Sequence, residues 1–281
     1  MPYPWAVVDV LHATDLNSAI AAAAAGAGPG LPIAGIAGYL FGLTLSNDVG
    51  TPDTVLDIAA GACADSTGTV MITLGDFTKS TAGAWAAGSG QNGMGAGLTL
   101  ANSTWYHVFA CINAGVSDIF FDTGAAGIHA PIGTTALRRI GSFKAGSAGA
   151  IWKFAQHGDR FDLGTPVSEY NGTPGVTTGV LLTLVAVPTG VIVTARLSGN
   201  MSDLTTPNTI AYLSSPTQTD IIAVGGGVAI TVTTGTISGG PTTYLAEVDT
   251  DTSQRIRRRV NSTTAVLNIV TNGWIDQRGR F

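Results

Sequence analysis

Residues 104–123 read TWYHVFACINAGVSDIFFDT and decide the fold class that the sequence predicts. Within 104–113, apolar and aromatic side chains occupy both sets of alternating positions, as in a central strand that is buried on both faces. A short connection containing Gly115 follows, so residues 117–123 are expected to return beside 104–113 as a hairpin. The stretch therefore predicts antiparallel β-structure, as in a β-sandwich.

Strand-like runs continue through the chain from Tyr39 onward. They are separated by glycine-rich turns at intervals of about ten residues, a spacing typical of sandwiches and jelly rolls. A second hairpin is expected to join 137–144 to 150–161, and a short helix or turn is expected at 79–85. No repeat of fixed period is present, which argues against a solenoid or a propeller. We therefore predict an all-β fold with two β-sandwich or jelly-roll-like domains.

The predicted domain boundaries follow changes in composition. Residues 165–179 are rich in Thr, Gly and Pro and are expected to form a linker. The expected organisation is an N-terminal helical or extended anchoring segment at 1–38, a first β-sandwich at 39–164, this linker, and a C-terminal β-sandwich at 180–281.

The segment 1–38 is predicted to dock on something else. Thr14 or Asp15 can cap a short helix that ends before the glycine- and proline-rich stretch starting at Gly26. A helix of this length is not stable alone, so sister chains or another protein are expected to hold it. The candidate anchoring residues are Trp5, Leu11, Leu16 and Ile20. Prolines and glycines interrupt the uncharged stretch 19–45, which argues against a membrane span.

The chain is poor in charge. Only 11% of its residues are charged, less than half of the usual share of about 25%. Because the mean hydropathy is +0.32, we expect an obligate homo-oligomer whose subunits cover apolar surface between them. The net charge of −5 argues against a general nucleic-acid binder. The one basic cluster, Arg255 with Arg257–Arg259, is interpreted as a strand with a charged face.

Three short motifs resemble catalytic or cofactor patterns, and each has a simpler interpretation. GSGQNG at 88–93 matches the GxGxxG of dinucleotide sites, but glycines follow where a helix would have to begin, so a mobile loop is expected. DTG at 122–124 resembles the active-site turn of dimeric aspartic proteases, but the second element of that family is missing, so a strand end is expected. HGDR at 157–160 lacks a nucleophile and is interpreted as a turn.

The remaining polar residues define no catalytic, cofactor or metal site. Cys63 and Cys111 lie in apolar runs without metal-ligand spacing and are expected to be buried free thiols. Asp249 and Asp251 offer too few oxygens for calcium.

One aromatic residue suggests an adhesion site. Sugar-binding sites stack rings on exposed aromatic side chains, often beside carboxylates, so Trp274 with Asp276 is the candidate adhesion surface. Burial of Trp274 in the core is the competing interpretation.

Five phrases carry a resemblance to a known class of proteins. They are YLFGLTLSND (39–48), WAAGSGQNGMGAG (85–97), STWYHVFA (103–110), LRRIGSFK (137–144) and FAQHGDRFDL (154–163). Such phrases occur in this order in structural proteins of tailed bacteriophages and prophages. Over residues 39–163, the chain resembles the tail-fibre or head-fibre class.

This resemblance implies a non-enzymatic virion protein made in the cytoplasm of a bacterial host. It implies a homotrimer whose N-terminus attaches to other virion proteins (portal, neck, tail or capsid), and whose residues 180–281 reach a host-surface glycan or protein. A protein that decorates and stabilises the capsid or neck is the alternative, and a polysaccharide depolymerase is a third. No cofactor, nucleic-acid partner or membrane partner is expected.

Overall fold

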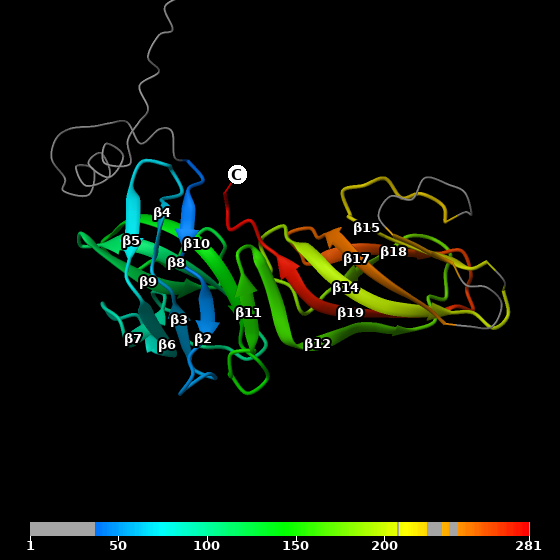
Figure 1. The fold of residues 1–281 in the computed structure, drawn as a ribbon, viewed down its shortest axis with the longest axis horizontal. Helices are drawn as coiled ribbons and strands as arrows, with labels where there is room; N and C mark the ends of the chain where they lie inside the picture. Colours follow the sequence, from blue (N-terminus) through cyan, green and yellow to red (C-terminus); the bar gives the residue numbers. More distant parts are fainter. Residues whose placement is uncertain (1–36, 207, 224–231, 236–240, 281) are drawn as a thin grey trace, which may run out of the picture.

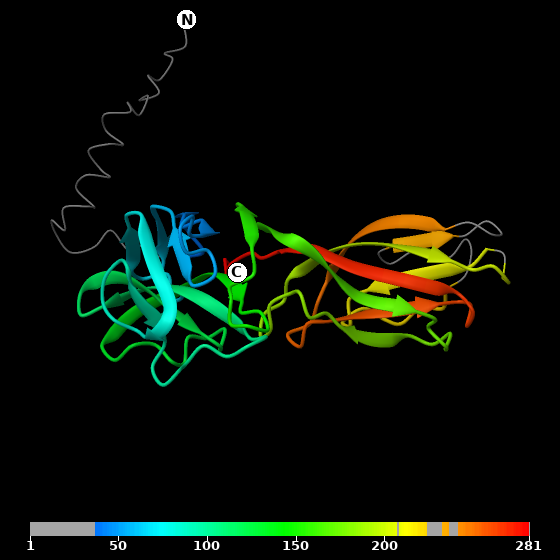
Figure 2. The ribbon, with the colours of Figure 1, turned by 90° about the horizontal axis from the view of Figure 1, so that it is seen from below.

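The computed structural model describes residues 37–206, 208–223, 232–235 and 241–280. This part of the chain contains nineteen β-strands and no helix, so the all-β prediction is confirmed. None of the described residues form a helix that could cross a membrane. Figures 1 and 2 show two β-rich bodies arranged along one long axis.

The body that comes first in the sequence, called the first half, contains eleven strands. They are β1 (Leu40–Gly42), β2 (Leu45–Asn47), β3 (Val55–Ile58), β4 (Gly61–Ala64), β5 (Met71–Leu74), β6 (Phe77–Ala84), β7 (Gln91–Met94), β8 (Trp105–Asn113), β9 (Val116–Asp122), β10 (Thr134–Lys144) and β11 (Phe154–His157).

The long strand β12 (Arg160–Gly172) joins this body to the second half. The second half contains β13 (Val180–Thr183), β14 (Thr194–Ser202), β15 (Ile210–Ser214), β16 (Val232–Gly235), β17 (Thr242–Asp249), β18 (Arg255–Val260) and β19 (Val266–Ile275).

The predicted hairpin of residues 104–123 is confirmed. β8 and β9 pair in antiparallel register from His107–Asp122 to Asn113–Val116. Ala114 and Gly115 form the two-residue turn, and both have positive φ, the backbone that tight hairpin turns require. Every side chain of β8 from Trp105 to Cys111 is buried, as the pattern of apolar residues on both faces predicted.

The first half closes because its sheet curls back on itself. The strand order β10-β8-β9-β7-β6-β3-β2-β11-β12 belongs to one twelve-stranded sheet that continues into the second half. β10 nevertheless packs onto β2 and β12, since a Cβ added at Gly141 would come 2.6 Å from Leu45 Cδ1 and 3.2 Å from the Phe161 ring. The short sheet β1-β4-β5 lies beside it and adds Cys63 and Ile72 to the core.

The second half is sandwich-like. One layer is the end of the long sheet, in the order β12-β19-β14-β17, and the other is the separate sheet β13-β18-β15-β16. Alternate side chains of both layers meet in one core; Leu197 and Leu267 come from the first layer, Ile256 and Leu213 from the second. The inward–outward alternation along β17 and β18 is the period-2 pattern of strands that are buried on one face.

Several predicted elements need correction. Residues 79–85, expected as a helix or turn, lie largely in strand β6, which pairs with β3. The expected hairpin of 137–144 with 150–161 is reduced to its turn, where Ala145 and Ile151 form one antiparallel bridge; beyond it β10 pairs with β8, whereas β11 pairs with β12 and β2. The segment expected as a linker, 165–179, is a continuous strand as far as Gly172. The helix expected within 1–38 lies outside the described residues.

β12 links the two halves through its two ends. Residues 160–163 pair with β11 in the first half, whereas residues 160–162 and 167–172 pair with β19 in the second. The pairing of β12 with β19 is interrupted by a register shift between Asp162 and Val167, where β12 passes from the first half to the second. A strand shared between two packed bodies restricts their relative movement, because bending would break ladder hydrogen bonds on one side or the other.

Candidate functional site

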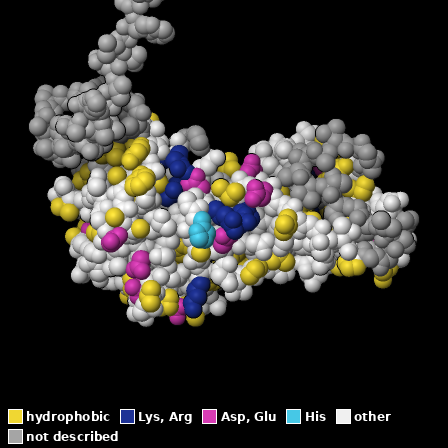
Figure 3. Space-filling view, viewed as in Figure 1, with side chains coloured by type: hydrophobic (Ala, Val, Ile, Leu, Met, Phe, Trp, Pro, Cys, Tyr) yellow, Lys and Arg dark blue, Asp and Glu magenta, His cyan; other side chains and the backbone are white. Residues whose placement is uncertain are grey.

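A concave region with several charged side chains lies where the two halves meet. β19 ends at Ile275, and residues 276–280, called the C-terminal tail, cross from the second half onto the first. An open cavity of about 610 Å³ is lined by the tail and by both halves. Figure 3 shows that Lys and Arg side chains on this face gather near the middle of the molecule. The residues that line the cavity are Ser66, Phe109, Ala125, Ala126, Leu137, Arg138, Arg139, Gly190, Val191, Ile192, Thr252, Asp276, Gln277, Arg278, Gly279 and Arg280.

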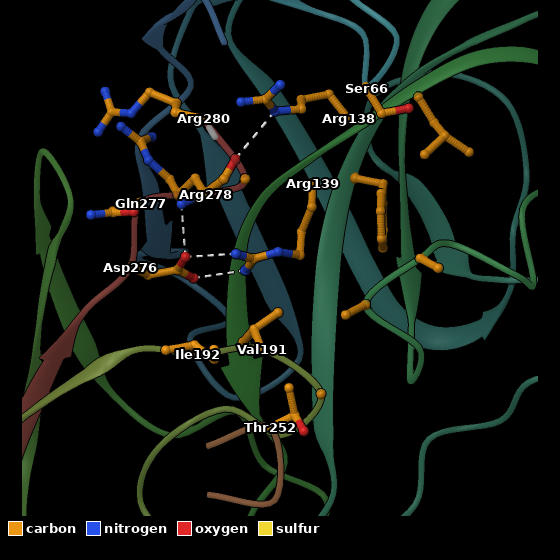
Figure 4. Close-up of a pocket in the computed structure, with 16 residues that line it drawn as sticks. Ser66, Arg138, Arg139, Val191, Ile192, Thr252, Asp276, Gln277, Arg278 and Arg280 are labelled. Carbon is orange, nitrogen blue, oxygen red and sulfur yellow. Dashed lines mark hydrogen bonds and ion pairs between the residues drawn. The ribbon is translucent and has the colours of Figure 1, made fainter. Parts of the chain in front are cut away.

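A bidentate ion pair forms the centre of this region. Arg139 of β10 donates from Nη1 to Asp276 Oδ2 at 2.7 Å and from Nη2 to Asp276 Oδ1 at 2.6 Å (Figure 4). The Arg278 amide also donates to Asp276 Oδ1 at 2.8 Å. Burial raises the pKa of the Asp276 carboxyl, but Arg139 and these hydrogen bonds outweigh burial and hold the pKa below its usual range. Asp276 is therefore an ionised, fully engaged carboxylate.

Two further arginines of the tail share a second carboxylate. Arg278 donates to Asp159 Oδ1 from Nε at 3.2 Å and from Nη2 at 3.1 Å, and Arg280 pairs with Asp159 Oδ2. Asp159 belongs to the turn between β11 and β12, and its carbonyl accepts the Asp276 amide at 2.8 Å. The tail is thus bound to the first half by both its backbone and its side chains.

Arg138 differs from its neighbours. Its Nε donates to the Arg278 carbonyl at 3.1 Å, and Figure 4 shows this bond across the cavity wall. No carboxylate of the described residues forms an ion pair with Arg138. Burial and the neighbouring arginines lower the pKa of this guanidinium. Arg138, Arg139, Arg278 and Arg280, called the arginine cluster, therefore face two carboxylates, Asp159 and Asp276.

A buried histidine lies behind the ion pair. His107 Nδ1 is 2.9 Å from Ser142 Oγ, which also accepts a bond from Arg139 Nη1 at 3.2 Å. Both His107 and Ser142 are fully buried. Burial, and secondarily the Arg139 charge, lowers the pKa of His107 to about 4. A neutral imidazole sealed from substrate positions the arginine rather than acting as a catalytic base.

Hydrogen bonds to backbone groups strengthen the junction beside the cluster. The carbonyl of Val185, in the second half, accepts bonds from Lys144 Nζ at 2.5 Å and Trp105 Nε1 at 3.2 Å, both in the first half. Glu169 of β12 accepts from the amides of Val185 and Ala186 at 2.7 and 3.0 Å. These bonds fix the 184–193 connection against the first half.

The prediction that Trp274 and Asp276 form an adhesion surface is wrong. Trp274 is 1% exposed because it stacks on Phe161, with ring centroids 5.0 Å apart, and meets the Trp105 ring edge-on at 5.2 Å. Asp276 is also 1% exposed and is occupied by Arg139. A sugar ring could reach neither residue. The competing interpretation, burial of Trp274 in the core, is confirmed.

The candidate anchoring residues Trp5, Leu11, Leu16 and Ile20 lie outside the described residues.

Of the three motifs, DTG and HGDR lie where the sequence predicted them, at a strand end and in a turn. Asp122 ends β9 and accepts bonds from the amides of Gly124 and His129 and from His129 Nδ1. HGDR forms the tight turn between β11 and β12.

The glycine-rich motif is more ordered than a mobile loop. Gly88 and Gly90 form a turn with positive φ, and the Gly88 amide donates to Asp118 Oδ2 at 2.7 Å. Gln91–Met94 is strand β7, which runs parallel to β6 and β9. A strand occupies the place where a dinucleotide site needs a helix.

The prediction of buried free thiols is confirmed, and three of the four arginines in the basic cluster form a charged strand face, whereas Arg258 is buried on the other face. Cys63 and Cys111 are buried free thiols. Arg255, Arg257 and Arg259 share one face of β18: Arg255 pairs with Asp251, Arg259 pairs with Asp220, and Arg257 donates to carbonyl oxygens of the segment 215–218. In the described residues, no three His, Cys, Asp or Glu side chains group as metal ligands would.

Sequence reasoning missed the arginine cluster. Arg138 and Arg139 were visible in LRRIGSFK as two consecutive cations within an apolar strand, and buried arginines require partners. Their partners lie in the tail, about 140 residues away, and no local pattern connects the two segments.

A scan against protein-family models and a search of curated proteins find no match to this chain.

Proposed function

We propose that this chain is a structural protein of a bacteriophage particle, of the fibre type, with its first half near the particle and its second half pointing outward. One observation carries the proposed orientation. Gly38, near the start of the described chain, lies in contact with the tail, since a Cβ added there would come 2.5 Å from the Arg280 carbonyl oxygen. Ala37 also lies beside Gly68 of the first half, so the described chain begins on the first half, close to the junction.

The strands of the second half run from the junction to the opposite end. Thr194 pairs with Ile275 at the junction, whereas Ser202 pairs with Val266 and Gly172 with Leu267 at the far end. Among the described residues, the connections at that far end are 173–179, 203–206 and 261–265, called the tip loops. An attachment through 1–36 would present the tip loops to the surroundings (Figure 1).

The finer architecture is part of the same proposal. Together with β12, the second half has eight strands, β12 to β19. If these strands are renumbered 1 to 8, their order is 1-8-3-6 in one layer and 2-7-4-5 in the other. Two interlocked Greek keys produce this order, which favours a jelly roll for the second half. We propose a sandwich-like domain also for residues 39–164, behind an N-terminal anchoring segment. An experimental structure of the full chain tests this architecture, and a helix-rich or single-layered second half would contradict it.

The tip loops are held in one arrangement. Asp203 accepts bonds from the amides of Thr205 and Thr206 and from the hydroxyls of Thr209 and Ser262, so it connects two of the loops. Burial raises the pKa of Asp203, but the hydrogen bonds from Ser262 and Thr205 outweigh it and keep the carboxyl ionised. A pre-organised surface loses little entropy on binding, which suits adhesion to a host glycan or protein.

Apolar surface supports the proposed homotrimer. β17 is the last strand in the order of the long sheet, and Leu245 on it is exposed. Exposed strand edges with apolar residues favour pairing with another chain. Light scattering should give three times the chain mass of 28.4 kDa, and Leu245→Lys should lower it. A monomer over all concentrations would remove the trimer from the proposal.

Deletion of residues 1–36 tests the attachment. The shortened chain should fold, because the strands of the described residues pair with one another, but it should be absent from purified particles. Normal incorporation would contradict attachment through this segment. Counting copies in particles distinguishes the alternatives, since a few trimers at the tail fit a fibre, whereas tens to hundreds at the capsid fit a decoration protein.

Binding to host cells tests the tip. Leu204 is 81% exposed at the tip, so Leu204→Asp should weaken adsorption of labelled protein to host bacteria. Val49→Asp is the matched control, because Val49 is as exposed but lies in the first half. Equal adsorption of both variants would argue against the tip as the adhesive surface. Release of oligosaccharide from host polysaccharide would instead favour the depolymerase alternative.

A further inference from the structure

We infer that the arginine cluster at the junction binds a doubly charged oxyanion of the phosphate or sulfate class, free or as the terminal group of an ester. The inference concerns a ligand site and does not depend on the proposed fibre function. It rests on the balance of charge around the cavity, on donors without acceptors, and on the composition of the cavity walls.

The charge balance leaves two positive charges uncompensated. Arg139 is matched by Asp276, and Arg278 and Arg280 share the single carboxylate of Asp159. Arg138 has no carboxylate partner among the described residues, although it is only 4% exposed. Counted over the described residues, four guanidinium groups against two carboxylates leave an excess of two positive charges. Phosphate and phosphomonoesters carry about −1.5 to −2 at neutral pH, which matches that excess.

Buried hydrogen-bond donors within the cluster lack acceptors. Arg138 Nη2 and Arg278 Nη1 are buried and have no hydrogen-bond partner among the described residues, and both residues are only 4% exposed. An unpaired, buried donor on a charged group is costly, and such groups normally find a partner. The two residues are already held together by the bond from Arg138 Nε to the Arg278 carbonyl. An oxyanion offers several acceptors at once, and guanidinium groups bind it with two parallel hydrogen bonds.

The cavity walls differ in character. Arg138, Arg278 and Arg280 lie at one end of the cavity and Val191 and Ile192 at the other (Figure 4). Phe109 and Leu137 are further apolar residues of the lining. A volume of about 610 Å³ exceeds what an inorganic ion needs. The apolar wall therefore has room for the organic part of an ester whose charged end lies at the arginines.

A bound oxyanion would also connect the two halves. Arg138 and Arg139 belong to β10 of the first half, Val191 and Thr252 belong to the second half, and Arg278 belongs to the tail between them. A ligand that contacts all three requires the folded junction. It would therefore stabilise the native state by mass action.

The test uses the full chain and compares phosphate, phenyl phosphate and chloride at equal ionic strength. Titration calorimetry should give one site per chain for phosphate or phenyl phosphate. Thermal unfolding should occur at least about 2 °C higher in a ten-fold excess of either over its Kd than in chloride. Tighter binding of phenyl phosphate would assign an ester, and equal binding would assign the free ion. No heat and no stabilisation relative to chloride would overturn the inference.

Arg138→Met separates a ligand-binding role from a structural one. The variant removes a buried charge that has no carboxylate partner, but it also loses the bond from Arg138 Nε to the Arg278 carbonyl, so its melting temperature in chloride should fall by only a few degrees. Its phosphate affinity should fall at least ten-fold. Unchanged affinity in Arg138→Met would overturn the inference.

Two further variants complete the test. Arg280→Gln, at the more exposed rim of the cluster, should also bind several-fold more weakly, and it provides the test if Arg138→Met does not fold. Arg259→Gln is the control, because Arg259 pairs with Asp220 and neither residue lines the cavity, and it should bind as the natural protein does. Weakening by Arg259→Gln equal to that by Arg280→Gln would mean non-specific charge attraction and would overturn the site.

Discussion

Arg139 and Asp276 form a buried, bidentate ion pair between residues that are 137 positions apart in the sequence. One is in β10 of the first half and the other begins the tail that follows the final strand of the second half. The same carboxylate accepts the Arg278 amide, and the same guanidinium donates to Ser142. This single contact therefore determines where the second half ends relative to the first.

Removing the carboxylate charge should be strongly destabilising. Asp276→Asn leaves the Arg139 guanidinium buried without a counter-ion, and loss of one partner of a buried pair costs about 3–5 kcal/mol. Urea unfolding followed by tryptophan fluorescence measures the change. Asp249→Asn is the control, because Asp249 is exposed and accepts only the Thr194 hydroxyl, and it should cost under about 1 kcal/mol. Similar losses in both variants would mean that the pair contributes little.

His107 should make the protein less stable in mild acid. Burial and the Arg139 charge lower its pKa from 6.5 to about 4, against weaker opposing effects of Asp276 and Asp122. The unfolded chain then binds a proton that the folded chain does not, so stability is complete above pH 6.5 and falls as the pH falls to about 4. The loss contributed by His107 should reach about 3 kcal/mol over this range.

Urea unfolding at about pH 7.5 and about pH 5 measures this dependence, since histidine titrates between them. His107→Gln, which can keep a bond to Ser142, should lose about 2 kcal/mol less than the natural protein between these conditions. His157→Gln, on the exposed β11–β12 turn, should behave as the natural protein does. The prediction fails if His107→Gln retains the full pH dependence.

Gly95 should tolerate no side chain. A Cβ there would come 2.5 Å from the His129 carbonyl oxygen and 2.9 Å from the Phe121 carbonyl oxygen, and both belong to the backbone. Gly95→Ala should therefore cost about 1–3 kcal/mol, as overpacking does. Gly75→Ala is the control, because its Cβ would meet nothing within 4 Å. Chemical denaturation of both variants checks the prediction, and a Gly95→Ala variant as stable as Gly75→Ala would contradict it.

Both thiols should be unreactive in the folded protein. Burial raises the pKa of Cys63 and of Cys111 to about 12, so at about pH 8 only about one molecule in 10⁴ carries either thiolate. Iodoacetamide followed by intact-mass measurement should find no modification in the native state and two modified thiols in urea. Modification of a native thiol at the rate seen in urea would show that its strand opens readily.

Local patterns predicted what local interactions determine. The hairpin of β8 and β9 lies within twenty residues, which contain both strands and their turn, and it formed as predicted. β6 was misassigned because its polar sequence has little strand preference; its Lys79 is buried because it pairs with Asp118 of β9 at 2.9 Å. That partner is determined by the tertiary fold and has no signature near residue 79.

The other wrong predictions concern residues whose surroundings are determined by contacts with parts of the chain that are far away in the sequence. Trp274 and Asp276 looked like an exposed aromatic residue with a neighbouring carboxylate, and only the approach of Phe161 and Arg139 buries them. The same holds for the arginine cluster, whose members come from β10 and the tail. Residues 165–172 looked like a linker, but pairing with β19 supplies the hydrogen bonds that make them a strand.

The position of β19 has a consequence for how the molecule is made. Of the described strands it is the last in sequence, yet it lies inside the long sheet, between β12 and β14. A ribosome therefore releases β12 and β14 with their facing edges unpaired, and those edges stay open until the final strand arrives. The second half must be completed late, and a chain interrupted before residue 266 would expose two aggregation-prone edges in place of one closed layer.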